Sequence, residues 1–87
     1  MDTEQIRAKA QSIKSATNKI IDNIPDSLYP KMGAVNWAAV RCDAVYWQPE
    51  TDNYLVSVAK ANSGELAVYL MDELTRLGYE VDVTTEW

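Results

Sequence analysis

Residues 38–61 read AAVRCDAVYWQPETDNYLVSVAKA, and this stretch decides the fold that the sequence predicts. Its two ends, 38–47 and 54–61, are rich in Val, Ala and Tyr, as β-strands are. The six residues between them, QPETDN (48–53), combine Pro, Asp and Asn and so have the composition of a turn. Two strand-like runs joined by a short polar loop predict a β-hairpin.

The alternation along the first strand assigns its side chains to two faces. One face is predicted to carry Val40, Cys42, Ala44 and Tyr46, and the other to carry Arg41, Asp43, Val45 and Trp47. This assignment directs Trp47 outward, where an aromatic flanked by acids would suit a protein interface. The alternative is that Val45 and Trp47 belong to the core, because the phase of the strand is reversed or a bulge interrupts it.

A helix is expected on each side of the hairpin. The first is predicted from about residue 3 to 23, because Asp2 and Gln5 have capping-box spacing and Pro25 ends the segment. Its apolar and small residues fall at steps of four and three, which trace one stripe. They are Ile6, Ala10, Ile13, Thr17, Ile20 and Ile24.

The second helix is predicted at about 64–77, with Asn62 or Ser63 as its N-cap and Gly78 in the left-handed conformation after its end. The chain then closes on a third strand, 79–87, in which Glu80, Asp82 and Glu86 alternate with more apolar residues. Such alternation indicates one dry and one solvated face. Residues 25–36, with two Pro and one Gly, are expected to be a connector, with a short helical turn near 26–30 as an option.

These elements, in the order αββαβ, predict one α+β domain built as a two-layer sandwich. It divides into an N-terminal helix (1–24), the connector (25–36) and a ββαβ body (37–87). The third strand could pair with either strand of the hairpin. We expect it beside the first, giving the strand order 2-1-3 with both helices on one face of the sheet.

Charge is distributed unevenly along the chain. Residues 1–24 contain four basic and three acidic side chains, whereas residues 25–87 contain four basic and ten acidic ones. An acidic body repels phosphate, so direct binding to nucleic acid or to an anionic membrane is not expected. A protein with a basic surface is the more natural partner.

Several kinds of catalysis are disfavoured by composition. The chain has no histidine and one cysteine, Cys42, so Cys–His and Ser–His–Asp arrangements and a structural zinc site are excluded. Carboxylate pairs at Glu50 and Asp52, or at Glu80 and Asp82, leave acid catalysis or a bound metal as an alternative, but a solvated turn and strand explain them more simply. We therefore expect no enzymatic activity, no cofactor and no metal.

The sequence lacks the features of membrane-spanning and secreted proteins. No apolar run approaches the ~20 residues that a membrane helix needs. The polar start MDTEQIRAKAQ is unlike a signal peptide. With a single cysteine besides, we expect a cytoplasmic protein.

Acidic and aromatic side chains are the candidates for binding a partner. Acids would steer association and pair with Lys and Arg, and an aromatic would supply buried contact. The predicted set is Asp43, Trp47, Glu50, Asp52, Tyr54, Glu80, Asp82 and Glu86. Some of these acids, Asp43 among them, would converge if the third strand lay beside the first. Trp37, Tyr79 and Trp87 are expected to be core or edge residues.

The first helix offers a different interface. Its stripe is expected to pack on the sheet, but a homodimer seam along Ile6, Ile13 and Ile20 is an alternative, in the manner of a short coiled coil. The chain would then be a structural or assembly protein. A third hypothesis is a small-ligand pocket between the helices and the sheet.

At NWAAVRCDAVYW (36–47) and VDVTTEW (81–87) the chain resembles small acidic accessory proteins of phages and prophages. The resemblance covers roughly residues 36–87 and transfers no functional residue. It implies a protein that inhibits a host machine by occupying a protein surface, as anti-CRISPR proteins and nucleic-acid mimics do. Our leading hypothesis is therefore a non-enzymatic inhibitor that blocks a basic surface on a nucleic-acid-handling host protein.

Overall fold

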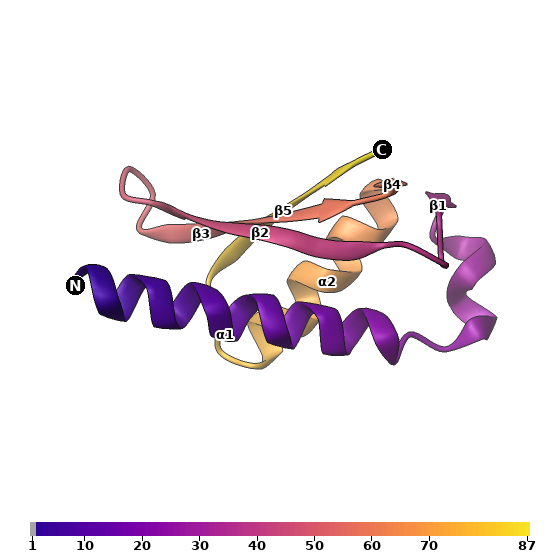
Figure 1. The fold of residues 1–87 in the computed structure, drawn as a ribbon. Helices are drawn as coiled ribbons and strands as arrows, with labels where there is room; N and C mark the ends of the chain where they lie inside the picture. The colour runs from indigo at the N-terminus through magenta and orange to yellow at the C-terminus, as the bar shows by residue number, and fades with distance from the viewer. Residues whose placement is uncertain (1) are drawn as a thin grey trace.

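The computed structural model describes residues 2–87 and has an α+β fold with two separate sheets (Figure 1). The elements in chain order are α1 (Thr3–Asp22), the 3-10 helix η1 (Asp26–Lys31), β1 (Ala34–Val35), β2 (Arg41–Gln48), β3 (Asn53–Ala59), β4 (Ala61–Asn62), α2 (Gly64–Arg76) and β5 (Val81–Glu86). This confirms the predicted fold class and the helical turn in the connector.

The helix α1 begins at the predicted capping box. The Asp2 carboxylate accepts a hydrogen bond from the Gln5 backbone N–H at 2.8 Å, and the Gln5 side chain accepts one from the Asp2 backbone N–H at 3.4 Å. Ile13 and Thr17 are fully buried in the middle of the helix, as the stripe predicts. Near the C-terminal end of α1, Ile21 is buried and Ile20 is only partly buried. The buried stripe of the helix is therefore shifted by one residue there.

The helix α2 also has its predicted ends. The Ser63 hydroxyl accepts a hydrogen bond from the Leu66 N–H at 2.9 Å, which makes Ser63 the N-cap. The same hydroxyl donates to the carbonyl of Met32, and so ties the connector to the start of the helix. Gly78 follows the helix with φ of +94°, the conformation expected there.

The order of the strands differs from the prediction. The main sheet has the order β2-β3-β5, with β3 antiparallel to β2 and parallel to β5. The predicted order 2-1-3 is therefore wrong, because the third strand pairs with the second strand of the hairpin. The physical reason lies in composition, since β3 carries no charged side chain and can be buried centrally, whereas β2 contains Arg41 and Asp43.

A β-bulge in β2 reverses the predicted faces of that strand. The pairing steps from Cys42 opposite Val58 to Ala44 opposite Ser57, which leaves Asp43 without a partner. After this extra residue, Val45 and Trp47 lie on the same face as Cys42, toward the core, and Tyr46 lies on the other face. The prediction that Trp47 faces outward is wrong, and the alternative of a bulged strand holds.

A second, two-stranded sheet was not predicted. β1 pairs antiparallel with β4, and the Asn36 N–H donates to the Lys60 carbonyl at 2.9 Å. Lys60 separates β3 from β4 with φ of +68°, which ends β3 earlier than expected. Asn36 also accepts hydrogen bonds from the turn after it, including one from the Val40 N–H at 2.8 Å, so β2 starts three residues later than expected.

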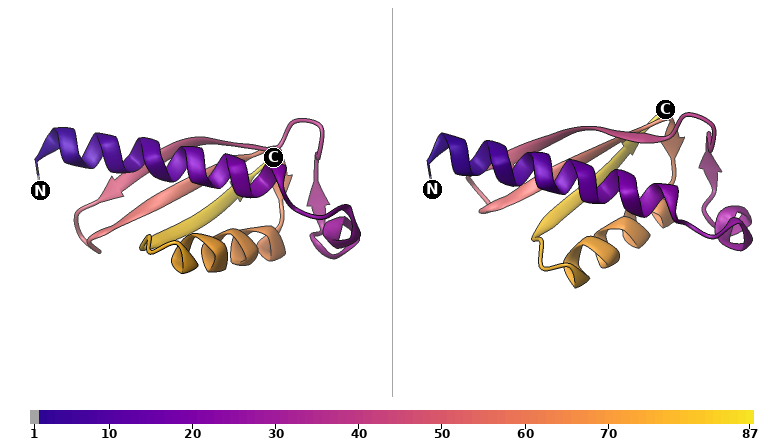
Figure 2. Two further views of the ribbon diagram at one scale, coloured as in Figure 1. Left: turned by 90° about the horizontal axis from the view of Figure 1, so that it is seen from below. Right: turned by 60° about the horizontal axis from the view of Figure 1, so that its bottom comes forward.

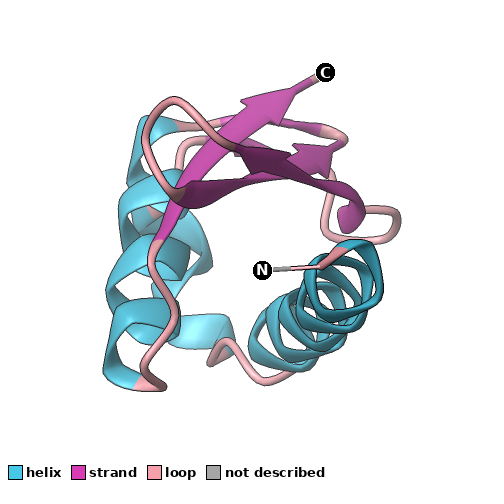
Figure 3. Ribbon diagram, turned by 90° about the vertical axis from the view of Figure 1, so that its left-hand side faces the viewer, coloured by secondary structure: helices cyan, strands magenta, loops and turns pink. Residues whose placement is uncertain are grey.

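Both helices lie on the same side of the main sheet (Figure 3). α1 packs beneath β2, and α2 packs beneath β5 (Figure 2). The core between the layers is apolar, and its fully buried members include Ile13, Val56, Val58, Leu66, Leu70 and Leu74. The opposite side of the sheet, which we call the outer face, carries no helix (Figure 3).

Candidate functional site

The outer face is built from rows of residues that pair across the three strands. Tyr46 pairs with Leu55, which pairs with Asp82, and the next row is Ala44, Ser57 and Thr84. Tyr46 is 55% exposed, which is high for a large apolar side chain. The uncovered sheet therefore presents an aromatic ring and a carboxylate in one row.

Tyr46 is the aromatic residue that the sequence prediction missed. The two aromatics chosen instead, Trp47 and Tyr54, face the helices, where their rings contact each other with centroids 4.9 Å apart. Tyr54 is 4% exposed, and its hydroxyl donates to the Ile6 carbonyl at 3.4 Å. Burial, with a smaller contribution from Asp52, raises the pKa of Tyr54. Tyr54 is therefore a structural residue of the core, whereas Trp47 packs against the core and also lines a shallow surface hollow with Asp52 and Glu80.

Four of the predicted acids gather at the hairpin end of the sheet. Glu50 and Asp52 lie in the β2–β3 turn, and Glu80 and Asp82 lie at the start of β5, which runs beside β3 from that same end (Figure 1). We call these four residues the acidic end. Because β5 is parallel to β3, its first residues must lie next to the turn that precedes β3.

A hydrogen-bond network joins the turn to β5. The Asp82 carboxylate accepts from the side-chain amides of Gln48 at 3.2 Å and Asn53 at 3.0 Å, and Gln48 donates in turn to Asn53 at 2.9 Å. Asp52 has φ of +55°, a left-handed conformation that Asp and Asn tolerate better than most residues. All four acids are exposed, and Asp82 in addition has a structural role because its carboxylate joins the turn to β5.

Little positive charge offsets the acidic end. Lys9 lines a shallow hollow there with Asp52 and Glu80, and its Nζ lies 5.7 Å from the centre of the Tyr79 ring. Across residues 2–87 the ion pairs within 4.0 Å are Arg41–Asp22 and Arg76–Glu73, at 3.0 and 3.2 Å. None of the four acids takes part in them, so their charge is directed to solvent.

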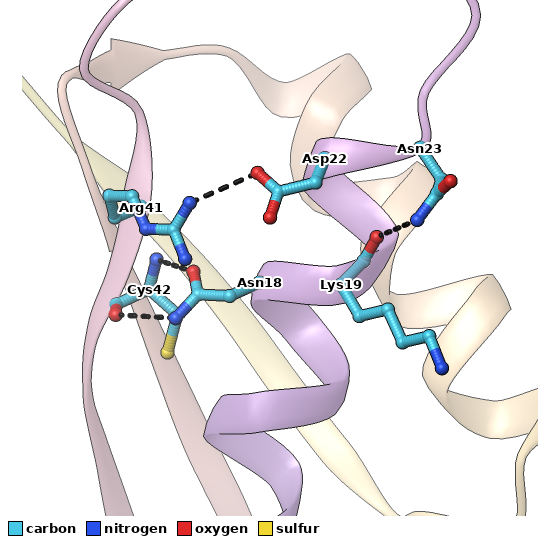
Figure 4. A network of polar contacts seen from close by, with 6 residues as sticks. All are labelled: Asn18, Lys19, Asp22, Asn23, Arg41 and Cys42. Carbon is cyan, nitrogen blue, oxygen red and sulfur yellow. Dashed lines mark hydrogen bonds and ion pairs between the residues drawn. The ribbon is translucent and has the colours of Figure 1, made fainter.

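The other two predicted acids lie elsewhere. Asp43 is the extra residue of the bulge in β2, and β3 separates it from β5. Glu86 is at the far end of β5, where it pairs with Ala59. The wider cluster that required the third strand beside the first therefore does not form. Arg41, which could have neutralised Asp43, pairs with Asp22 of α1 (Figure 4).

The predicted dimer seam on α1 is only partly at the surface. Ile13 is 0% exposed, and Ile6 and Ile20 are half-buried against the core. The stripe packs on the sheet because α1 covers β2, which matches the interpretation favoured for it. A seam that needs Ile13 is not available in this fold.

The surface of the two helices away from the sheet has an apolar groove. One part, of about 460 Å³, lies between α1 and α2 and is lined by Ala16, Ile20, Tyr69 and Leu77 among others. The adjoining part lies between η1 and α2 and shares Tyr69. The small-ligand hypothesis expects a pocket between the helices and the sheet, whereas the residues that line this groove include none from β2, β3 or β5.

The expected aromatic core residues are placed as follows. Trp37 stacks on Tyr29, with ring centroids 3.8 Å apart, and Tyr79 packs against the core. Trp87 is 67% exposed, so of the two places expected for it, the core or the edge of the sheet, it does not occupy the core. Within residues 2–87 there is no group of three or more acidic or cysteine side chains placed to hold a metal ion. The same residues include no helix with the length and hydropathy to cross a membrane.

Comparison with protein-family models, with curated proteins and with solved structures finds no match to this chain.

Proposed function

We propose that this protein is a non-enzymatic inhibitor that binds a basic surface of a nucleic-acid-handling host protein and blocks it. The observation that carries the proposal is the row Tyr46–Leu55–Asp82 on the uncovered outer face, next to the acidic end. An exposed aromatic beside a group of uncompensated carboxylates has the composition of a contact surface for a cationic protein.

Two physical effects support this function. The negative charge at the acidic end would attract a basic surface over a distance of about one Debye length, ~8 Å at physiological salt, and would speed association. Tyr46 and Leu55 would then supply apolar area that is removed from water on contact. The same charges would repel free nucleic acid, so the partner is the protein that binds nucleic acid rather than the nucleic acid itself.

The cost of the arrangement also favours a binding role. Like charges close together destabilise a folded protein. Glu50, Asp52 and Glu80 make no ion pair within the described residues that would offset this cost. A partner with Lys and Arg side chains would remove it on binding.

The test compares two triple variants of equal charge. Glu50→Gln, Asp52→Asn and Glu80→Gln together neutralise the acidic end, and Asn at position 52 suits its left-handed conformation. The control, Asp43→Asn, Glu65→Gln and Asp72→Asn, removes the same number of charges elsewhere on exposed positions. Both variants change the formal net charge of −5 by the same amount.

Wild-type protein is immobilised, and proteins from a host cytoplasmic lysate are captured at low and high salt and identified. We expect one nucleic-acid-handling protein that is released by high salt, that the control triple variant retains and that the acidic-end variant loses. Its binding should also fall with Tyr46→Ala. Equal capture by both triple variants would contradict the proposal, and recovery of nothing but further copies of this chain would favour the assembly hypothesis.

A further inference from the structure

The main sheet has two edges, and they differ in how well they are protected. β2 and β5 each have β3 as their strand neighbour on one side, and no strand of residues 2–87 pairs with their other side. An edge strand exposes backbone N–H and C=O groups that can pair with another chain.

The edge of β2 is blocked. The bulge at Asp43 interrupts its regular backbone. Next to the bulge, the Asn18 side chain accepts a hydrogen bond from the Cys42 N–H at 2.8 Å and donates one to the Cys42 carbonyl at 3.4 Å (Figure 4). The side chain thus occupies the position that a neighbouring strand would take. Bulges and covered backbone groups are devices that prevent strand addition.

The edge of β5 is regular and open. The Tyr54 N–H donates to the Glu80 carbonyl at 3.2 Å, and Tyr54 is the register partner of Val81. In a parallel ladder this pattern repeats every second residue. The backbone groups of Asp82, Thr84 and Glu86 are therefore directed to β3. Those of Val81, Val83 and Thr85 are directed away from it, to the free edge.

We propose that the free edge of β5 accepts an extended basic segment of the partner protein as a fourth strand. This inference rests on the proposed function and names the manner in which the partner binds. Asp82 and Glu86 lie on the outer face of β5, four residues or ~13 Å apart. Lys or Arg at alternate positions of the added strand would lie beside them on that face. Backbone hydrogen bonds would supply affinity, and the charge pairs would supply selectivity.

A second copy of this chain fits the same edge poorly. If two β5 strands paired antiparallel with their helices on one side of the joint sheet, residues of the outer face would meet each other. In the register centred on Thr84, Asp82 of each copy stands opposite Glu86 of the other. Like charges directly opposite each other destabilise strand pairing. Charge complementarity therefore selects a basic segment over self-association.

The probe is a synthetic nine-residue peptide of alternating Lys and Val with blocked ends, and the matched control peptide has Glu in place of Lys. Amide hydrogen exchange of the full chain is followed by NMR with and without each peptide. We expect the Lys peptide to slow exchange at Val83 and Thr85 about tenfold or more, with little effect on amides already bonded to β3. The Glu peptide should cause no protection.

Two proline variants test the same contact by affinity. Val83→Pro removes the N–H at the free edge of β5 while sparing the ladder to β3. Val45→Pro is the matched control, because Val45 is likewise half-buried on an edge strand, with its N–H directed away from β3. Circular dichroism checks that both are folded. We expect Val83→Pro to weaken the Lys peptide about tenfold and Val45→Pro to bind as wild type does.

Unprotected Val83 and Thr85 amides in wild-type protein at saturating Lys peptide would overturn the inference, whatever the variants do. Suppose that the Lys peptide bound without protecting these two amides and that its binding required Glu50, Asp52 and Glu80. The proposal of a basic partner would then stand, and the proposal of strand addition would fall. A different result would separate the two proposals in the opposite direction. If no host protein were captured from the lysate, but the Lys peptide and not the Glu peptide protected both amides, the edge would be confirmed as an acceptor of basic strands and the proposed function would fall.

Discussion

Tyr46 and Trp47 are neighbours in β2, and replacing each by Ala should have opposite consequences. Trp47 faces the core and contacts the Tyr54 ring, whereas Tyr46 lies on the outer face. The bulge at Asp43 alone decides which of the two is buried. Trp47→Ala should therefore cost stability and Tyr46→Ala should cost binding.

The magnitudes follow from burial. A large aromatic buries about 150–250 Å², which at about 25 cal/mol per Å² corresponds to about 4–6 kcal/mol when burial is complete. Most of the Trp47 side chain is buried, so Trp47→Ala should lower the free energy of unfolding by about 3–5 kcal/mol, including the lost ring contact. Tyr46 is 55% exposed, so a little less than half of its surface is buried and Tyr46→Ala should cost about 2 kcal/mol by the same rule.

The assay is urea unfolding followed by far-ultraviolet circular dichroism, because removing a Trp changes the fluorescence signal. Thermal unfolding should show a decrease in Tm of about 15–30 °C for Trp47→Ala and of about 8–16 °C for Tyr46→Ala. The binding assay should show the reverse order. A larger loss of stability for Tyr46→Ala than for Trp47→Ala would refute the bulged register and remove Tyr46 from the candidate surface.

Substitutions at Ser63, Gly78 and Cys42 test other parts of the structure. Ser63→Ala removes the cap of α2 and leaves the Met32 carbonyl without its donor, so urea unfolding should show a loss of about 2–4 kcal/mol, whereas Ser63→Thr should retain most of the stability. Gly78→Ala should lower stability by about 1–2 kcal/mol, because Gly78 has φ of +94°. Gly64→Ala is its control, because the added methyl group would meet nothing within 4 Å. Thermal unfolding should show it to be neutral or stabilising by up to about 1 kcal/mol. Burial raises the pKa of the Cys42 thiol above its ordinary value of 9.0. With rising pH the thiol therefore loses its proton in the unfolded chain before it does so in the folded protein. The free energy of unfolding should fall as the pH rises through the folded pKa. Stability measured from pH 7 to 11 should show this loss, and Cys42→Ala should lack that part of it; identical curves for the two proteins would contradict the assignment.

The candidate surface was only partly predictable. The acids of the turn and of the last strand were identified correctly as exposed, because polar turns and alternating strands are local patterns. Their grouping at one end required the position of β5, which depends on contacts between residues far apart in the chain. The exposed aromatic was assigned to the wrong neighbour because one unpaired residue, Asp43, changes the face of every residue after it.

The sequence by itself determined the two helices with their ends and the existence of the three longer strands. The capping box at Asp2, the cap at Ser63 and the left-handed Gly78 each depend on residues within four positions, and the periodicity of α2 is a property of one segment. Only the tertiary structure decided that β5 lies beside β3, that β2 is bulged and that its edge is closed by Asn18. Each of these features depends on contacts between residues that are far apart in the chain. Short-range sequence patterns allow more than one pairing of the strands. The pairing that forms is the one that places β3, with its buried apolar side chains, between two other strands.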